Sequence, residues 1–184
     1  MSHFVYFKTA FQDPKVAALT ASSRYTIQKV LDQMESDCKY IVEYGAGEGV
    51  LTRKLLDRLP ENGHIFAVER NSFLLHKLRQ IADPRLSVIH DDVLAVSQYL
   101  HQLPAPRVDM VISGIPLSFW AGTRFKDRDT IMRTTHEALR PGGKFVVYQY
   151  TPILFPTLKR QFSLATWQYE FRNFPPYFVM VGEK

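Results

Sequence analysis

Three glycines at alternate positions follow the first apolar run of the chain. Ile41 and Val42 belong to a short apolar run that predicts a buried strand, and Gly45, Gly47 and Gly49 come soon after it. Glycine has no Cβ, so its backbone bends tightly and lies close to a ligand. Leucines at helical spacing follow, and a helix that begins there presents its first N–H groups to that ligand. The stretch therefore predicts a strand, a ligand-binding turn and a helix.

Acidic residues stand at the ends of three predicted strands. Glu43 lies beside the glycine turn, where a carboxylate suits a cationic ligand better than a pyrophosphate. Glu69 follows the turn by about 20 residues, the position from which an acid accepts both hydroxyls of a ribose. Asp92 is placed to accept from an adenine amino group, and Asp91 is the weaker candidate because side chains alternate along a strand. Open α/β sheets bind ligands at the carboxyl ends of adjacent strands, so we expect these acids to share one site.

Alternating strand and helix patterns position these residues. They predict an α/β fold with a mostly parallel seven-stranded sheet, helices on both faces and a C-terminal antiparallel hairpin that turns at Pro175 and Pro176. The predicted strands are 40–43, 64–69, 85–90, 108–113, 144–150, 167–174 and 177–181. The predicted helices are one that begins at Asp13 and Pro14, one that Ser22 or Ser23 caps, and then 50–59, 71–81, 93–103, 130–139 and 157–165.

Length and composition set the broad class. With 184 residues, of which 46% are hydrophobic, we expect one globular domain spanning 1–184. No apolar run approaches the roughly 20 residues that span a bilayer. The single cysteine, Cys38, excludes an intramolecular disulfide and a cysteine zinc cluster, which fits a reducing cytoplasm, and no metal site is predicted. The net charge of +5 indicates an anionic partner or a basic surface.

The glycine pattern also carries a family resemblance. Residues 43–49, Glu-x-Gly-x-Gly-x-Gly, resemble the first motif of the class I S-adenosylmethionine-dependent methyltransferases, and residues 139–147 resemble the segment before their fifth strand. The motif alone leaves another doubly wound nucleotide binder open. The resemblance implies a Rossmann-like fold, methyl transfer as the activity and S-adenosylmethionine as the cofactor. The residues that it places at the cofactor are Glu43, Gly45, Ala46, Gly47, Gly49, Glu69, Arg70, Asp92, Val93 and Ser113.

The acceptor site is expected directly after the fourth predicted strand. The carbonyl groups of Gly114 and Ile115, freed by Pro116, are placed to hold the N–H groups of an amine. Methyl transfer is an in-line displacement, so orienting the acceptor supplies much of the rate. The residues predicted to act in catalysis are Ser113, Gly114, Ile115, Pro116 and Tyr148, the last to accept or relay a proton, and no general base is predicted.

Two methyltransferase families share this region. In the ribosomal RNA adenine dimethylases the fourth strand ends in Asn-x-Pro-Tyr/Phe, where the Asn contacts the adenine amine and the ring stacks on the base. Gly114 and Leu117 stand in those places here, so the chain offers neither the amide nor the ring. Flipped bases are held by stacking and edge contacts, which makes nucleic acid the less favoured substrate.

The second family is similar to the chain over nearly its full length. It comprises the bacterial phospholipid N-methyltransferases, which methylate phosphatidylethanolamine stepwise toward phosphatidylcholine. The resemblance implies an N-terminal helical arm, residues 1–36, that closes over the cofactor and meets an anionic membrane through Lys8 and Lys15, with Ser22 or Tyr25 near the cofactor. The resembling segments are 13–16 leading to 21–24, then 113–117 and 172–176.

Three more side chains complete the predicted substrate site with Tyr25. Phe119 and Trp120 are expected to face the ammonium that methylation creates, through cation–π attraction, and packing in the core or in a lid is the alternative. Arg172 is expected to contact a phosphodiester, because its guanidinium fork matches phosphate oxygens. A surface arginine on a terminal strand is the alternative for Arg172.

The sequence therefore predicts an N-methyltransferase that acts on phosphatidylethanolamine or a related phospholipid. Its expected location is the cytoplasm, with peripheral contact at the inner face of the cell membrane. An rRNA adenine or small-molecule amine methyltransferase is one alternative. A non-catalytic membrane-binding module that retains the fold is the other. The oligomeric state is not predicted.

Overall fold

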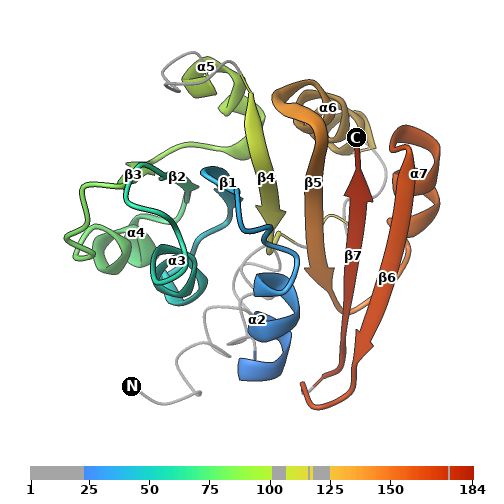
Figure 1. Cartoon of the computed structure of the whole chain (residues 1–184), viewed down its shortest axis with the longest axis horizontal. Helices are drawn as coiled ribbons and strands as arrows, with labels where there is room; N and C mark the ends of the chain where they lie inside the picture. The colour runs from blue at the N-terminus through green and yellow to red at the C-terminus, as the bar shows by residue number, and fades with distance from the viewer. Residues whose placement is uncertain (1–22, 101–106, 116, 118–124, 174) are drawn as a thin grey trace.

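A seven-stranded sheet runs through the molecule (Figure 1). The structure is a computed structural model that describes residues 23–100, 107–115, 117, 125–173 and 175–184. The strands lie in the order β3-β2-β1-β4-β5-β7-β6. Their bounds are β1 (Tyr40–Tyr44), β2 (His64–Val68), β3 (Leu86–Ile89), β4 (Val108–Ser113), β5 (Leu139–Gln149), β6 (Leu164–Glu170) and β7 (Tyr177–Glu183).

The strand directions follow the predicted pattern. β1, β2, β3, β4 and β5 pair in parallel, whereas β7 pairs antiparallel with both β5 and β6. The central strands are almost continuously apolar, as expected where helices cover both faces of a parallel sheet. Ile41, Val111 and Ile112, for example, are fully buried. The predicted seven-stranded, mostly parallel sheet with a C-terminal hairpin is confirmed.

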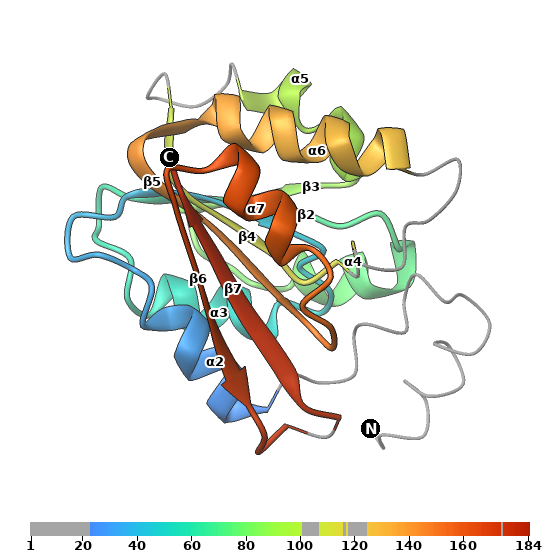
Figure 2. The ribbon, with the colours of Figure 1, turned by 90° about the vertical axis from the view of Figure 1, so that its right-hand side faces the viewer.

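Helices cover both faces of this sheet (Figures 1 and 2). On one face Val30, Leu55 and Leu78 pack in one core cluster, and on the other Met132 and Leu158 pack in a second. The first face carries α2 (Arg24–Leu31), α3 (Val50–Leu56) and α4 (Ser72–Leu78). The second carries the turn η2 (Val93–Ala95), α5 (Ser97–Leu100), α6 (Phe125–Ala138) and α7 (Phe155–Gln161).

The predicted helix 93–103 is wrong in its form. The chain makes the 3-10 turn η2 and then the single-turn helix α5, because Val96 N–H donates to the carbonyl of Val93 and Tyr99 N–H to that of Val96. The hydroxyl of Tyr99 then donates to Asp91 at 2.6 Å, which ties this segment to the end of β3. Residues 101–103 lie outside the described residues.

Three other predicted boundaries shift, two of them where the chain pairs with distant strands. The predicted helix 157–165 ends at Gln161, since Ser163 N–H donates to the carbonyl of Glu183 and the chain has joined the sheet by Leu164. The predicted helix 130–139 begins earlier, at Phe125. β5 begins at Leu139 instead of 144 and pairs with β4 across a register shift between Val108 and Met110.

The sheet brings the predicted site residues to one edge. Tyr44 pairs with Val68 on one side and with Ser113 on the other, and Ser113 pairs in turn with Val147. The carboxyl ends of four neighbouring strands are therefore level. The residues that follow them, Gly45, Glu69, Gly114 and Tyr148, lie along this edge.

Two features are absent from the described ranges. None of their helices is long and apolar enough to cross a bilayer. Nor do three or more His, Cys, Asp or Glu side chains gather there closely enough to hold a metal ion. Cys38 is buried, and burial raises the pKa of its thiol to about 12, so it is a poor nucleophile.

Candidate active site

The glycine turn has the backbone conformation that its sequence predicts. Gly45, Gly47 and Gly49 adopt φ values of 73°, 60° and 81°, a region that residues with a Cβ rarely enter. Gly45 also lies close to the end of β4, since a Cβ on it would sit 2.9 Å from the side chain of Ile115. Gly49 allows α3 to meet Leu78, because a Cβ there would lie 2.9 Å from that side chain. All three glycines thus have a conformation that favours glycine, and Gly45 and Gly49 are also required by packing.

Glu69 holds the glycine turn in place. Its carboxylate is buried, and one oxygen accepts from Gly47 N–H at 2.9 Å while the other accepts from Asn71 N–H at 2.7 Å. A carboxylate oxygen has two lone pairs, so each can still accept from a ribose hydroxyl. The proposed sugar contact of Glu69 remains a prediction, and the structure adds a second role that links the turn to the start of α4.

Glu43 is buried behind the turn. Thr52 of α3 donates its hydroxyl hydrogen to this carboxyl group at 2.6 Å. Burial raises the pKa of Glu43 to about 8, the Thr52 hydrogen bond opposes the rise, and the neighbouring charge of Glu69 adds to it. The carboxyl is therefore mostly protonated at neutral pH, and a cation placed beside it would lower its pKa. Thr52 carries no motif signal, and sequence analysis did not identify it.

The two aspartates after β3 have different surroundings. Asp91 accepts from the hydroxyl of Tyr99 and from the N–H of Asp92 at 2.7 Å, so both of its oxygens hold the local chain. Asp92 accepts from Leu94 N–H at 3.1 Å and lies 3.4 Å from a guanidinium nitrogen of Arg70. Its side chain is 40% exposed. Asp92 is thus the more available of the two for an adenine amino group, and its contact with Arg70 joins two predicted cofactor residues.

Ala46 and Val93 have buried side chains. Ala46 N–H, like Gly45 N–H, donates to the carbonyl of Val68, which fixes the turn against β2. Val93 packs in the core cluster that contains Val68. A ligand at this edge would therefore meet mainly the backbone of these two residues, and their cofactor contacts stay predictions.

The end of β4 brings four predicted catalytic residues together. Ser113 is fully buried, and its hydroxyl accepts from Ile115 N–H at 3.3 Å, so it shapes the turn. Gly114 N–H donates to the carbonyl of Tyr44 at 3.2 Å. A Cβ on Gly114 would lie 2.5 Å from the hydroxyl oxygen of Tyr148, which shows how closely that phenol packs against the backbone. Pro116 lies outside the described residues.

Tyr25 and Arg172, two predicted substrate residues, are in contact. The guanidinium carbon of Arg172 lies 4.0 Å from the ring centroid of Tyr25, and Arg24 donates to the Tyr25 hydroxyl at 2.7 Å. Arg172 also donates two hydrogen bonds of 2.8 Å to Glu170, so its Nε and Nη2 are already engaged. A phosphate contact through the remaining nitrogen of Arg172 stays a prediction. Phe119 and Trp120 lie outside the described residues, as do Lys8, Lys15 and Ser22.

Asn173 is a positioning residue that sequence analysis did not single out. It is buried, and its side-chain oxygen accepts from Ser23 N–H at 2.6 Å and from the Thr26 hydroxyl at 3.2 Å. Its amide nitrogen donates to the carbonyl of Pro175. Asn173 thereby fixes the start of α2 to the hairpin, with Ser23 as the helix cap. The available signal was its place inside the resembling segment 172–176.

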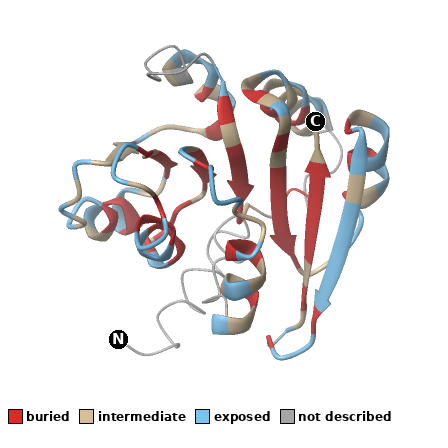
Figure 3. Ribbon diagram, in the orientation of Figure 1, coloured by how far each residue is buried: buried red, intermediate tan, exposed pale blue. Residues whose placement is uncertain are grey.

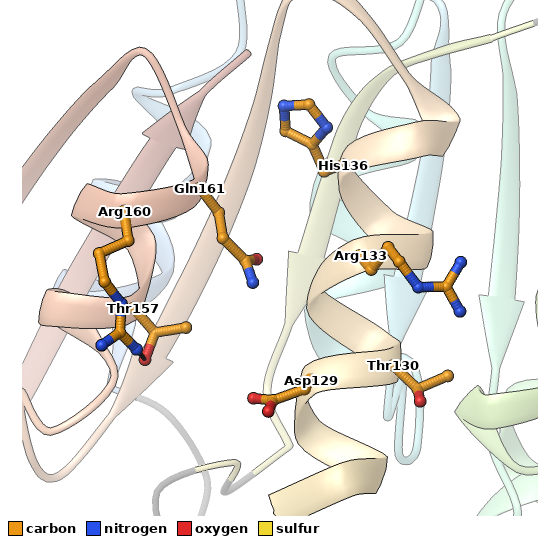
Figure 4. A pocket seen from close by; sticks show the side chains of 7 residues that line it. All are labelled: Asp129, Thr130, Arg133, His136, Thr157, Arg160 and Gln161. Carbon is orange, nitrogen blue, oxygen red and sulfur yellow. Dashed lines mark hydrogen bonds between the residues drawn. The ribbon is translucent and has the colours of Figure 1, made fainter.

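A groove of about 490 Å³ lies between α6 and α7 (Figure 4). Both of its arginines make hydrogen bonds to neighbouring side chains, Arg133 to Glu137 at 3.2 Å and Arg160 to Thr157 at 3.3 Å. None of the predicted site residues lines it. Its lining residues are Asp129, Thr130, Arg133, His136, Thr157, Arg160 and Gln161.

Comparison with known proteins identifies the family. Residues 41–143, more than half of the chain, match a family model described as a methyltransferase domain. The chain belongs to this methyltransferase family. The matched residues include the glycine turn, the three acids and the end of β4, so the family assignment rests on the same edge of the sheet as the site.

Two relatives of this methyltransferase indicate different acceptors. It is 27% identical over 165 residues to the ornithine lipid N-methyltransferase of Singulisphaera acidiphila, covering 88% of this chain and 84% of that protein. It is 31% identical over 120 residues to the ubiquinone/menaquinone biosynthesis C-methyltransferase UbiE of Vibrio cholerae. That match covers 65% of this chain and 44% of UbiE, so the chain spans less than half of the second relative.

Solved structures share the fold of this methyltransferase. Precorrin-6y C5,15-methyltransferase from Geobacter metallireducens superposes with a TM-score of 0.66 at 16% identity, over 88% of this chain and 90% of that one. A Streptococcus mutans protein in complex with SAH gives a TM-score of 0.61 at 16% identity, over 85% and 97% of the two chains. The cofactor is S-adenosylmethionine. The bare glycine turn and the buried acids behind it suit this cationic nucleoside, with the individual contacts as predicted above.

Proposed function

We propose that this methyltransferase methylates the amine of a lipid, with phosphatidylethanolamine or a related phospholipid as the acceptor. The observation that carries the proposal is the extent of the match to the ornithine lipid N-methyltransferase, which spans 88% of this chain and 84% of that protein. A match of that extent reaches well beyond residues 41–143, the segment that the family model covers. On this proposal the protein works as a peripheral protein at the inner face of the cell membrane.

The end of β4 supports an amine in preference to a nucleobase. Leu117 is fully buried in the core, so the position where the rRNA adenine dimethylases carry a stacking ring has no exposed surface. Gly114 has no side-chain amide that could read the edge of a base. The carbonyl group of Gly114 is the first candidate acceptor for the N–H groups of an amine, beside the hydroxyl of Tyr148. The carbonyl of Ile115 already accepts from Leu117 N–H at 2.8 Å and can receive an amine only through its second lone pair.

The chemistry asks for positioning more than for acid–base groups. When bound, S-adenosylmethionine supplies an electrophilic methyl group on a sulfonium. The neutral amine nitrogen forms the new C–N bond as the C–S bond breaks, the thioether leaves as S-adenosylhomocysteine, and the product ammonium releases one proton to solvent. The end of β4 orients the nitrogen, which in well-aligned reactions accounts for several kcal/mol of the barrier, about 7 or more.

C-methylation of a quinone precursor is the second candidate. The observation that favours it is the identity of 31% to UbiE over 120 residues. That similarity includes no more than 44% of UbiE, so it supports the shared methyltransferase chemistry more than a shared acceptor.

Transfer of a labelled methyl group tests the proposal. The purified protein would be incubated with labelled S-adenosylmethionine and, in separate reactions, phosphatidylethanolamine vesicles, ornithine lipid vesicles, a demethylated quinone, RNA and small amines. We expect label in the aminolipid, and mass spectrometry should show the mass of the lipid increased by the added methyl group. Label only in the quinone would establish the second candidate, and label only in RNA would refute both. Binding of S-adenosylhomocysteine with no transfer to any acceptor would favour a non-catalytic module.

A further inference from the structure

Exposed apolar side chains are concentrated on one strand. Within the described ranges eight large apolar side chains are exposed, and five of them fall between residues 153 and 171. Three of these are aromatic and stand at alternate positions, with exposures of 49% for Trp167, 47% for Tyr169 and 69% for Phe171. We refer to Trp167, Tyr169 and Phe171 as the aromatic stripe. Figure 3 shows β6, which carries its first two members, as mostly exposed.

The aromatic stripe is held in a defined orientation. Alternate residues of a strand point to the same face, and the rings of Trp167 and Tyr169 lie 5.4 Å and 5.0 Å from that of Phe178 on β7. Phe178 in turn packs against the core cluster beneath α6 and α7. β6 is the last strand of the sheet, so no further strand in the described structure covers its outer edge. Trp167 and Tyr169 are therefore supported by β7, and Phe171 extends the stripe beyond the end of β6.

The aromatic stripe lies at the same edge of the sheet as the active site. Tyr169 pairs with Phe178, and Phe178 pairs with Gln149, the residue after Tyr148. The strand spacing places β6 about 10 Å from β5, and both run in the same direction. Phe171, beyond the end of β6, therefore projects past the level of Tyr148. Trp167 and Tyr169 point to the face of the sheet that α6 and α7 cover, whereas Tyr148 packs in the core cluster of the other face. A partner that contacts the stripe would therefore adjoin the active-site edge without covering it.

The charge around the aromatic stripe is positive. Residues 152–178 contain Lys159, Arg160 and Arg172 against a single acid, Glu170. Glu170 is fully buried and ion-paired with Arg172, so this pair has no net charge, and Lys159 and Arg160 give the segment its net charge of +2. Arg24 adds a further cation beside Arg172, through the ring of Tyr25 that both contact. The combination of aromatic rings and cations suits an anionic, partly apolar surface.

We propose that the aromatic stripe docks this methyltransferase on an anionic lipid bilayer. Trp and Tyr prefer the headgroup region, where the ring is apolar and the N–H or O–H stays hydrated, and nearby cations are attracted to anionic lipids. The choice of a bilayer as the partner rests on the proposed lipid acceptor. Docking through this surface brings the edge that carries Gly114 and Tyr148 close to the headgroups.

Vesicle binding by the full chain tests the docking surface. We expect sedimentation with mixed phosphatidylcholine–phosphatidylglycerol vesicles and much weaker sedimentation with phosphatidylcholine alone. The variant Trp167→Gln/Tyr169→Gln/Phe171→Gln should bind about tenfold more weakly, because it removes the apolar contacts at the interface. Leu164→Gln is the matched control, since Leu164 is equally exposed but lies at the opposite end of β6. Equal binding by the triple variant and the wild type would overturn the proposal, as would an equal loss in the control.

Fluorescence gives an independent readout of the aromatic stripe. The chain contains two tryptophans, so Trp120→Phe leaves Trp167 as the single reporter. Its emission should shift to the blue on mixed vesicles and be quenched by brominated lipid. An unchanged spectrum would contradict docking. Sedimentation velocity without vesicles tests the alternative that the stripe binds a second copy of the chain. If the wild type forms a dimer that the triple variant does not form, and does not bind vesicles, the stripe is a dimer interface and the proposed bilayer contact is wrong.

The docking surface and the lipid acceptor can fail separately. If the stripe docks the enzyme, the triple variant should lose transfer to lipid in vesicles and keep transfer to lipid dispersed in detergent, with unchanged affinity for S-adenosylhomocysteine. Loss of both transfer reactions would contradict a docking role. Vesicle binding by the wild type without transfer to any lipid would refute the proposed acceptor and leave the docking surface standing.

Discussion

At the scale of single residues, the contact between Gly114 and Tyr148 decides what the acceptor site can hold. The closeness of the phenol to the backbone of Gly114 leaves no room for a side chain at that position. The carbonyl group and the hydroxyl that are proposed to meet the amine are thus fixed relative to each other. The phenol belongs to β5 and the glycine directly follows β4, so the pairing of these two strands sets the geometry.

Tyr148→Phe should lower kcat about tenfold, because one hydrogen bond to the acceptor is worth about 1.4 kcal/mol. Affinity for S-adenosylhomocysteine should not change, and steady-state kinetics with isothermal calorimetry would measure the two effects. The matched control is Tyr150→Phe, which keeps the ring stacked on Tyr177 at 4.4 Å. A wild-type kcat in Tyr148→Phe would show that this hydroxyl does not touch the acceptor.

Glu43→Gln should remove a pH dependence of stability. Burial raises the pKa of Glu43 to about 8 in the folded protein, against an ordinary value of 4.5. Above pH 4.5 the unfolded chain releases this proton while the folded protein keeps it, so wild-type stability falls as the pH rises toward 8. The variant keeps a hydrogen bond to Thr52 and should exceed the wild type at pH 8 by an amount on the order of 3 kcal/mol.

Urea unfolding at pH 5 and pH 8 would measure the effect of Glu43→Gln. Calorimetry in buffers of different ionisation enthalpy provides the functional counterpart. A cation beside Glu43 lowers its pKa, so binding of S-adenosylmethionine to the wild type should release a proton, and the variant should not release it. Parallel pH dependences of stability in the two proteins would show that Glu43 is ionised in the fold.

At the scale of elements, the end of β6, the hairpin and α2 form one unit. Glu170 is buried and paired with Arg172, Arg172 stacks on Tyr25 of α2, and Asn173 accepts from the first residues of that helix. The hydrogen bonds of Arg172 hold the pKa of Glu170 at about 2, against the effect of burial. This junction of β6, the hairpin and α2 therefore requires an ionised Glu170. It carries two of the predicted substrate residues, Tyr25 and Arg172.

Glu170→Gln should destabilise the protein by about 2 kcal/mol at neutral pH, the cost of losing charged hydrogen bonds at a buried position. The folded pKa is depressed, so this contribution is present above about pH 4.5 and is lost as the pH falls toward about 2. Thermal unfolding between pH 7 and pH 3 would measure it. The control is Glu137→Gln, whose pair with Arg133 is exposed and worth less than about 0.5 kcal/mol. Equal losses in both variants would contradict a structural role for the junction.

At the scale of the whole molecule, the two edges of the sheet have different roles. The carboxyl edge carries the glycine turn and the acceptor site. At the opposite edge Asp109 accepts from Lys39 N–H and Tyr40 N–H at 2.9 Å and 2.8 Å and pairs with Arg140. Burial alone would raise the pKa of Asp109, but these donors outweigh it and hold the pKa below its ordinary value. Asp109 thereby joins β1, β4 and β5 away from the site.

A variant at each edge should separate stability from binding. Asp109→Ala should lower the free energy of unfolding by about 2 kcal/mol, since Lys39 N–H and Tyr40 N–H lose their acceptor and Arg140 keeps only its more distant partners, Glu35 and Asp37. Its affinity for S-adenosylhomocysteine, measured below the unfolding transition, should stay within about twofold of the wild type. Gly47→Val should instead abolish binding, because its side chain would occupy the ligand's approach, and the φ of 60° at this position, which valine disfavours, adds a loss of stability. Tight binding by Gly47→Val would place the cofactor elsewhere.

The predictions that succeeded rest on local patterns. Apolar runs located all seven strands, and helical spacing located the helices between them. The glycine turn, Glu69 and Asp92 lie at one edge because strand ends in a parallel sheet are level. The preference for Asp92 over Asp91 follows from side-chain alternation and agrees with the partners of the two residues. The predicted helix 157–165 ends early because Ser163 pairs with the distant residue Glu183, whereas the predicted helix 93–103 is replaced by η2 and α5 through bonds between residues three apart and the contact of Tyr99 with Asp91.

The sequence alone determined the succession of strands and helices along the chain, the glycine turn and the family of the protein, since each depends on residue type and short-range spacing. Only the tertiary structure decided that Glu43 is buried on Thr52, that Tyr148 packs on Gly114, that Arg172 is paired with Glu170 and that β6 leaves an aromatic stripe exposed. Periodicity states which face a side chain occupies. The partner on that face is fixed by strand order and register, which arise from contacts between residues far apart in the chain.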